Sequence, residues 1–579
     1  MKQFEVWAPG ADTVALVTAG HTHPMTRGAE GWWTAPGVPA QHGADYGYLV
    51  DGDGPFPDPR SRHQPDGVHG LSRVVEHARF AWTDAHWPGR ALPGAVTYEL
   101  HIGTFTSGRT FDAAIERLDH LVDLGVDLVE VMPVAAFPGR HGWGYDGVAL
   151  HAVHEPYGGP DGLKRFVDAC HARGLGVVLD VVYNHLGPSG NYLSAFGPYF
   201  THKHHTPWGA AVNLDDADSD EVRRFIIDSA LAWLRDYHVD GLRLDAVHAL
   251  ADDRAIHLLT ELQIAVEELA AEVGRPLFLV AESDRNDPLT VTGRERGGNG
   301  LAGQWTDDIH HALHSLLSGE RQGYYVDFGS YECLATTLTG AFFHAGTFSA
   351  FRGRTHGAPV DRARTPGHAF VTYLQNHDQV GNRATGDRLS ASVSPGRMAI
   401  GAALVLCSAF SPMLFMGEEW AASTPWQYFT DHQEPELADA VREGRRNEFA
   451  EHGWSADEVP DPQDTATVEA STLDWAEPAK DPHARMLGWY RDLIALRRTH
   501  PALTDPHLDA VRVAYDADAQ WVVMHRGPLR VVANLADSPQ SVPLDSAATG
   551  VLLASETAEA RGTGVLMAAE SAAVVTVAS

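Results

Sequence analysis

From Ala95 to about Trp420 the sequence alternates between short apolar runs and amphipathic helical patterns. Apolar strands joined by helices form parallel sheets that are covered on both faces. Eight such strands favour a closed (β/α)₈ barrel, the TIM barrel, over an open sheet. The helices with the clearest 3.6-residue spacing are predicted at 111–125, 160–174, 220–238 and 253–273. The eight predicted strands are 95–103, 126–134, 175–183, 241–247, 277–283, 303–309, 370–378 and 411–420.

The two ends of the chain have a different residue pattern from the region between them. Residues 1–92 contain short alternating runs with frequent Gly and Pro, which predicts an N-terminal β-sandwich. Alternation returns after Thr504 and predicts a C-terminal all-β domain, again a sandwich. The chain of 579 residues therefore divides into three predicted domains: 1–92, the barrel with its loop insertions at 93–503, and 504–579.

Composition excludes several classes of partner. The net charge of −33 argues against nucleic acid or an anionic membrane, because both are bound by clustered Lys and Arg. The three cysteines, Cys170, Cys333 and Cys407, are far apart, and Cys170 and Cys407 lie in apolar stretches, so we expect buried reduced thiols. The N-terminal residues contain no apolar signal core, and no run reaches the roughly 18 apolar residues of a membrane span. We expect a cytoplasmic protein.

Two charged residues interrupt one of the predicted strands, GLRLDAVH at 241–248. Side chains alternate along a strand, so Arg243 and Asp245 face the barrel axis while Leu242 and Leu244 face the helices. The pair lies near the carboxyl end of the strand, where barrels of this kind build active sites. Arg243 should keep the pKa of Asp245 low, so that the carboxylate is available as a nucleophile. The alternative is an ion pair that only fixes the core, although such pairs seldom improve stability over apolar packing.

Carboxyl groups also end three other predicted strands. Glu282 follows the apolar run PLFLVA and should emerge at the same rim as Asp245, with a pKa raised by apolar surroundings and nearby carboxylates. Asp378, preceded by His377, closes the strand at 370–378. Asp180 lies in LDVVYNH, the third strand. One acidic residue after a strand is often a helix cap, but four together are hard to explain as caps.

An ionised and a protonated carboxyl group that face one bond can cleave a glycoside. Adjacent strands lie about 4.8 Å apart, which suits the separation of about 5–5.5 Å of a retaining enzyme better than the wider spacing of an inverting one. In this scheme Asp245 attacks the anomeric carbon. Glu282 protonates the leaving oxygen and later deprotonates the incoming water. The sequence therefore predicts a retaining glycosidase or transglycosidase.

The motifs DVVYNH (180–185), GLRLDAVH (241–248), VAES (280–283) and QNHDQVGN (375–382) resemble the four ordered sequence regions of the α-amylase family, glycoside hydrolase family 13. The resemblance implies that Asp245 is the nucleophile, Glu282 the acid/base, and Asp378 a carboxylate that holds sugar hydroxyls and helps to distort the ring. It implies that Asp180 and Asn184 support the site. Further implied contacts with the sugar in the −1 subsite are Arg243, His185, His377 and Tyr145, of which Tyr145 stacks under the ring.

Other segments, among them YELHIGTFT and FMGEEWAASTPWQYFTDH, resemble one branch of this family. That branch hydrolyses the α-1,4 bond beside the terminal trehalose of maltooligosyltrehalose. The N-terminal FEVWAPGADTV is similar to the carbohydrate-binding-like sandwich that this branch shares with branching and debranching enzymes. Two alternatives are a glucan branching enzyme, which usually has Pro-Gly-His in place of residues 183–185, and a non-catalytic glucan-binding protein. The three carboxyl groups argue against the second.

We expect no cofactor and no metal. The His-rich THKHH at 201–205 should be a solvated loop, because a structural metal site normally needs four well-placed ligands. Asn184 matches a calcium-binding position of many α-amylases, but the calcium-binding insertion is short here. Five tryptophans are as well suited to packing as to sugar stacking: Trp143, Trp208, Trp305, Trp420 and Trp426.

Overall fold

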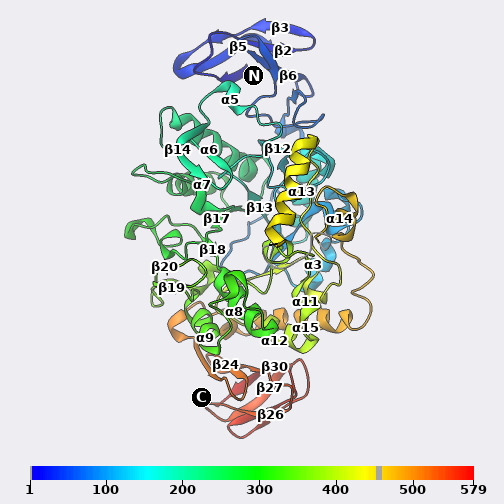
Figure 1. Ribbon diagram of the computed structural model, residues 1–579, viewed down its shortest axis with the longest axis vertical. Helices are drawn as coiled ribbons and strands as arrows, with labels where there is room; N and C mark the ends of the chain where they lie inside the picture. The colour runs from blue at the N-terminus through cyan, green and yellow to red at the C-terminus, as the bar shows by residue number, and fades with distance from the viewer. Residues whose placement is uncertain (1–2, 451–458, 579) are drawn as a thin grey trace.

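The computed structural model describes residues 3–450 and 459–578. All eight predicted barrel strands are present and form one closed parallel barrel between two β domains, one at each end of the long axis (Figure 1). The last strand pairs with the first, with Phe415 beside Glu99, and so closes the barrel. The strands are β9 (Thr97–Leu100), β10 (Leu128–Val131), β13 (Gly176–Val181), β16 (Gly241–Leu244), β17 (Phe278–Ala281), β18 (Gly303–Trp305), β21 (Phe370–Tyr373) and β22 (Ser411–Phe415).

Side chains that point toward the barrel axis form a core of their own, which includes Val178, Val280, Trp305 and Met413. The alternate positions, such as Leu242 and Leu244, join the larger core under the surrounding helices. This period of two is the reason that Arg243, between the two leucines, points inward.

The helices around the barrel follow seven of the eight strands. Residues 282–302, between β17 and β18, form only short 3₁₀ turns. The principal helices are α2 (Phe111–Ile115), α3 (Leu118–Leu124), α4 (Gly159–Ala172), α6 (Ser219–Asp236), α7 (Leu258–Val273), α8 (Asp307–Ser318), α12 (Pro395–Leu406) and α15 (His483–Thr499).

Two predicted helices were wrong in extent. The helix predicted at 111–125 is divided into α2 and α3, and its two pieces pack on different neighbours: Phe111 contacts Phe166 of α4, whereas Gly125 lies against Ile494 of α15. The helix predicted from Asp253 begins at Leu258 instead. Asp252 accepts a hydrogen bond from the Leu258 N–H at 2.7 Å and pairs with Arg223, so the preceding turn is held as a loop.

Two sheets form each flanking domain, as a sandwich requires. The exact domain limits stay predictions. The N-terminal strands are β1 (Gln3–Trp7), β4 (Thr26–Arg27) and β5 (Trp32–Pro39) in one sheet, and β2 (Val14–Thr18), β3 (His21–Pro24), β6 (Asp45–Val50), β7 (Asp53–Phe56) and β8 (Ser72–Arg73) in the other. The C-terminal strands are β23 (Arg512–Asp516), β24 (Trp521–Arg526), β25 (Leu529–Asn534), β27 (Ala548–Ala554) and β30 (Ser571–Val577) in one sheet, and β26 (Gln540–Pro543), β28 (Ala558–Arg561) and β29 (Gly564–Met567) in the other.

Most insertions follow the carboxyl ends of the barrel strands. The His-rich segment was predicted as a loop, which is wrong: it forms the hairpin β14 (Phe200–Thr206) and β15 (Gly209–Val212). A second hairpin, β19 (Thr347–Ser349) and β20 (Arg354–His356), follows α9 (Tyr331–Gly340). The three cysteines are buried thiols, as predicted. Among the described residues, no helix is both long and apolar enough to cross a membrane.

Candidate active site

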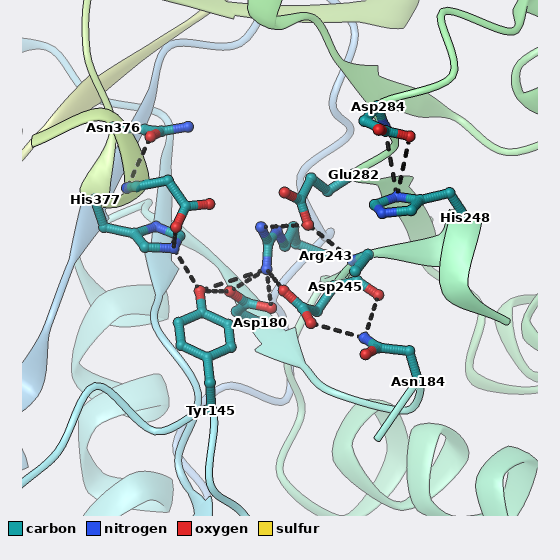
Figure 2. Close-up of polar contacts among 12 residues, drawn as sticks. Tyr145, Asp180, Asn184, Arg243, Asp245, His248, Glu282, Asp284, Asn376 and His377 are labelled. Carbon is teal, nitrogen blue, oxygen red and sulfur yellow. Dashed lines mark hydrogen bonds and ion pairs between the residues drawn. The ribbon is translucent and has the colours of Figure 1, made fainter. Parts of the chain in front are cut away.

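Arg243 is the centre of a cluster of charged side chains at the carboxyl ends of the barrel strands (Figure 2). Its side chain is fully buried and its guanidinium lies 4.3 Å from the ring centre of Trp305. Nη1 donates to Asp245 Oδ1 at 2.9 Å and to Asp180 Oδ2 at 2.7 Å. Nη2 lies 3.0 Å from Glu282 Oε2. One guanidinium therefore holds three carboxyl groups.

Asp245 and Glu282 are the first residues beyond two neighbouring strands. The register of β16 and β17 pairs Leu244 with Ala281, so the next positions, Asp245 and Glu282, lie side by side. Asn184 donates to Asp245 Oδ2 at 2.7 Å, so both oxygens of this carboxylate are oriented. The structure places Asp245 and Glu282 at the same rim of the barrel, as the sequence predicted.

The backbone of Ala246 forms a hydrogen bond with the Glu282 carboxyl group. Its N–H donates to Glu282 Oε2 at 2.7 Å, and its φ of 39° lies in the left-handed region that residues with a Cβ rarely adopt. Strain of this kind is concentrated at functional sites. Within the described chain, both polar contacts of Glu282 use Oε2, which leaves Oε1 to carry a proton.

Burial is the main cause that raises the pKa of Glu282 to about 8; Asp245 and Asp378 also raise it, and Arg243 opposes them. Burial also raises the pKa of Asp180 to about 6, against the pull of Arg243. At neutral pH Glu282 is therefore protonated while Asp180 is an anion. The predicted raised pKa of Glu282 agrees with this.

A second arm of the cluster runs through Tyr145 and His377. Tyr145 donates its hydroxyl proton to Asp180 Oδ2 at 2.7 Å and lies 2.8 Å from His377 Nε2. The Tyr145 and His377 rings are stacked with centres 5.3 Å apart. His377 Nε2 is 3.5 Å from Asp378 Oδ1. The structure thus brings both residues to the site, as predicted.

Asp378 was predicted to close the strand at 370–378, which is wrong. The strand ends at Tyr373, and Asp378 lies in the short helix α10 (His377–Gly381). Asn376 caps this helix through its side chain, which accepts from the N–H groups of Asp378 and Gln379. The capping box decides the local structure here, and the Asp378 side chain remains 37% exposed at the mouth of the site.

His185 lies beside the nucleophile candidate but is engaged with the protein. Its Nδ1 is 2.6 Å from Asn184 Oδ1 and its Nε2 is 2.9 Å from the carbonyl oxygen of Tyr145. Its ring stacks on Trp208, with ring centres 4.6 Å apart. Trp208 is 51% exposed, and it is the one of the five tryptophans that can offer a free face; the others are buried in packing.

Sequence reasoning missed Glu99. This residue lies in the apolar strand β9, is 1% exposed, and binds both the backbone N–H and the ring of His377. A charged residue inside an apolar strand was the signal that identified Arg243 as a candidate. The same signal is present in TYEL at 97–100.

The described residues contain one cluster with metal-ligand spacing, His204, Asp215 and Asp253, and it includes none of the carboxyl groups above. The ammonium group of Lys203 lies 2.8 Å from Asp215 Oδ2 and already balances its charge.

Comparison with known proteins decides the family. A model described as the catalytic domain of alpha amylase matches residues 106–208, and a domain of unknown function, DUF3459, matches residues 506–575. Malto-oligosyltrehalose trehalohydrolases from Mycobacterium tuberculosis and Arthrobacter ramosus are each 57% identical to the chain, over 94% of this chain and 94% of the relative. The chain belongs to the malto-oligosyltrehalose trehalohydrolase family. It is a glycosidase of the α-amylase family.

The trehalohydrolase from Saccharolobus solfataricus is 43% identical over 86% of this chain and 85% of that protein. Among solved structures, a Salmonella typhimurium protein is 38% identical with a TM-score of 0.90, over 99% of this chain and 97% of that chain. The pullulanase of Anoxybacillus sp. LM18-11, solved with maltotetraose, is 19% identical with a TM-score of 0.72, over 100% of this chain and 86% of that chain. This last likeness shows a shared fold.

Proposed function

We propose that the chain hydrolyses the α-1,4 bond beside the terminal trehalose of maltooligosyltrehalose and releases trehalose and a maltooligosaccharide. One observation carries the mechanism: Asp245 and Glu282 share the Arg243 guanidinium, yet the pKa of Glu282 is raised to about 8. The names of relatives at 57% identity support the substrate.

In the first step, a carboxylate oxygen of Asp245 attacks the anomeric carbon of the sugar while Glu282 gives its proton to the glycosidic oxygen. The carbon–oxygen bond breaks, trehalose leaves, and the maltooligosaccharide remains as an ester on Asp245. Arg243 and Asn184 keep the Asp245 carboxylate oriented for this attack.

In the second step, the Glu282 carboxylate takes a proton from water, and the water oxygen attacks the same carbon. The ester breaks and Asp245 is restored. Two inversions at one carbon leave the α configuration. Apolar burial of Glu282 suits both roles, because it favours the neutral acid before the first step and a proton-accepting base before the second.

The remaining residues form the wall of the −1 subsite in this proposal. Asp378 holds sugar hydroxyls at the exposed mouth, and Tyr145 stacks under the ring. Arg243 lies on the buried side, and His377 presents its Nε2 there, 2.8 Å from the Tyr145 hydroxyl oxygen. Both ring nitrogens of His185 already contact the protein, at Asn184 and Tyr145, as those of His377 do, at Glu99 and Tyr145.

The test compares maltotriosyltrehalose with uncapped maltopentaose. We expect release of free trehalose from the capped substrate, at a much higher rate than any cleavage of maltopentaose. Branched or lengthened chains would instead favour a branching enzyme. Binding without turnover would favour a glucan-binding protein. A cytoplasmic location and independence of cofactors stay predictions; fractionation of cells and assay after chelation test them.

A further inference from the structure

Glu99 lies on the first barrel strand, one layer below the catalytic rim. Its neighbours in the register are Glu130 on β10 and Phe415 on β22, and its side chain is 1% exposed. A carboxylate in such a place is costly unless donors satisfy it. Glu99 therefore needs partners, and the structure provides them from a single residue.

That residue is His377. Its backbone N–H donates to Glu99 Oε2 at 3.0 Å, and its Nδ1 forms a short hydrogen bond with Glu99 Oε1. The two contacts use both oxygens of Glu99 and fix both the position and the orientation of the imidazole ring. Because a carboxylate can only accept, Nδ1 carries a proton.

The other ring nitrogen carries a proton for an independent reason. The Tyr145 hydroxyl has one proton and gives it to Asp180 Oδ2 at 2.7 Å. Its oxygen can then only accept from His377 Nε2, which lies 2.8 Å away. The directions of these hydrogen bonds make His377 an imidazolium.

We propose that Glu99 is a positioning residue of this glycosidase, which acts through His377 by holding its imidazole doubly protonated, with Nε2–H at the wall of the sugar site beside Asp378. The inference rests on the proposed function in that it treats this wall as the −1 subsite. It places a second cation near Arg243, with the Tyr145 hydroxyl in contact with both groups.

The charged and titratable groups around His377 agree with this assignment. They are Glu99 on β9, Glu130 on β10, Asp180 on β13, Arg243 on β16, Asp378 in α10, Tyr145 in the loop before β12 (Ala149–Val153), and His101, which follows β9. Burial and Arg243 disfavour the charged ring, but Glu99 and Asp378 outweigh them and raise the pKa of His377 to about 9.

Glu130 provides a matched control. It is also inward-facing and buried, on the neighbouring strand, yet its Oε1 has no hydrogen-bond partner among the described residues. Burial, with Glu99 and Asp180 nearby, raises its pKa well above the usual range, so it is a neutral acid. Glu130→Gln therefore keeps both shape and charge, whereas Glu99→Gln keeps the shape and removes a charge.

The experiment measures kcat, KM and the pH profile of Glu99→Gln, Glu130→Gln, His377→Gln and the double variant Glu99→Gln/His377→Gln. We expect Glu99→Gln to lose about tenfold to a hundredfold in kcat at pH 8, somewhat less than the loss on removal of a donor itself. The loss should shrink toward pH 6, where the ring regains its proton. Glu130→Gln should keep the wild-type rate.

The double variant separates a role through His377 from a structural one. If Glu99 acts through His377, the double variant should be as active as His377→Gln within about twofold, because coupled residues are not additive. A loss that is the same at every pH, or a double variant that shows the full product of the two single losses, would overturn the proposal.

Nitrogen NMR of the histidine rings gives a readout that needs no turnover, with the His377→Gln spectrum as the assignment. At pH 8 we expect His377 doubly protonated in the wild type and neutral in Glu99→Gln; a neutral ring in the wild type would sink the inference. The assays should use both maltotriosyltrehalose and an α-maltosyl fluoride. If the wild type consumes only the fluoride, the proposed substrate is wrong, and the inference about Glu99 is still tested.

Discussion

The barrel buries charge at both ends, and the two clusters behave in opposite ways. At the base, where the strands begin, Asp84 and Asp240 bind His171 from either side at 2.9 and 3.1 Å. Arg275 donates to Asp240 and His238 pairs with Asp84. At the rim, three carboxyl groups share the single guanidinium of Arg243.

The pKa directions record the difference. At the base, burial opposes ionisation, but the histidines hold the pKa of Asp84 well below its usual range, and the two carboxylates raise the pKa of His171. At the rim, burial wins and the pKa values of Glu282 and Asp180 rise to about 8 and about 6. A buried charge that has enough partners stabilises a fold, whereas a carboxyl group short of partners keeps its proton and can deliver it.

The largest expected effect is at the rim. Asp245→Asn should lower turnover of maltotriosyltrehalose on the order of 10⁵-fold, the scale of the loss of a catalytic nucleophile. Its melting temperature should stay within a few degrees of the wild type, because the variant relieves the competition for Arg243. Steady-state assays and thermal unfolding check both. Near-normal turnover would remove Asp245 from the mechanism.

Glu282→Gln should cost about a thousandfold on the trehalose-capped substrate, because the variant has no proton to give to the leaving sugar. A glycosyl fluoride needs no acid, so formation of the ester from α-maltosyl fluoride should be nearly unaffected. The burst of fluoride release measures this step. An equal loss on both substrates would contradict the assignment of Glu282 as the acid.

Asp240→Asn tests the charged cluster at the base of the barrel. It removes the charge of a fully buried carboxylate that binds His171 and Arg275, and should lower the free energy of unfolding by about 3–5 kcal/mol. Denaturant unfolding measures the loss. The kcat of the folded fraction should stay within about twofold of the wild type, since Asp240 lies at the opposite end of the barrel. If the variant unfolds no more easily than the wild type, the contrast between the two clusters fails.

The smallest effect is on the pH profile. Glu282 acts as an acid and its pKa is raised to about 8, so kcat/KM should be steady at neutral pH and fall as the pH rises through about 8. A glycosyl fluoride needs no acid. With this substrate, the rate at which Glu282→Gln forms the ester should therefore not fall as the pH rises through about 8. If the wild-type kcat/KM falls instead near the ordinary pKa of a glutamate, burial does not determine the pKa of Glu282.

The sequence sufficed for the direction of the key side chains but not for everything that surrounds them. Side chains alternate along a regular strand, and this period of two was enough to predict that Arg243 and Asp245 point inward. Asp378 was assigned to a strand because the capping box of Asn376 was not recognised. Glu99 was missed because its partner, His377, is distant in the sequence and meets it only when the barrel closes. The substrate came from resemblance alone.

The configuration of the first product tests the central claim most directly. Proton NMR of maltotriosyltrehalose during the first minutes of hydrolysis, before the sugar mutarotates, distinguishes the anomers at the new reducing end. Attack by Asp245 beside Glu282 predicts the α-anomer of maltotriose. Early appearance of the β-anomer would mean that water attacks directly, and that the two carboxyl groups do not act as nucleophile and acid on one carbon.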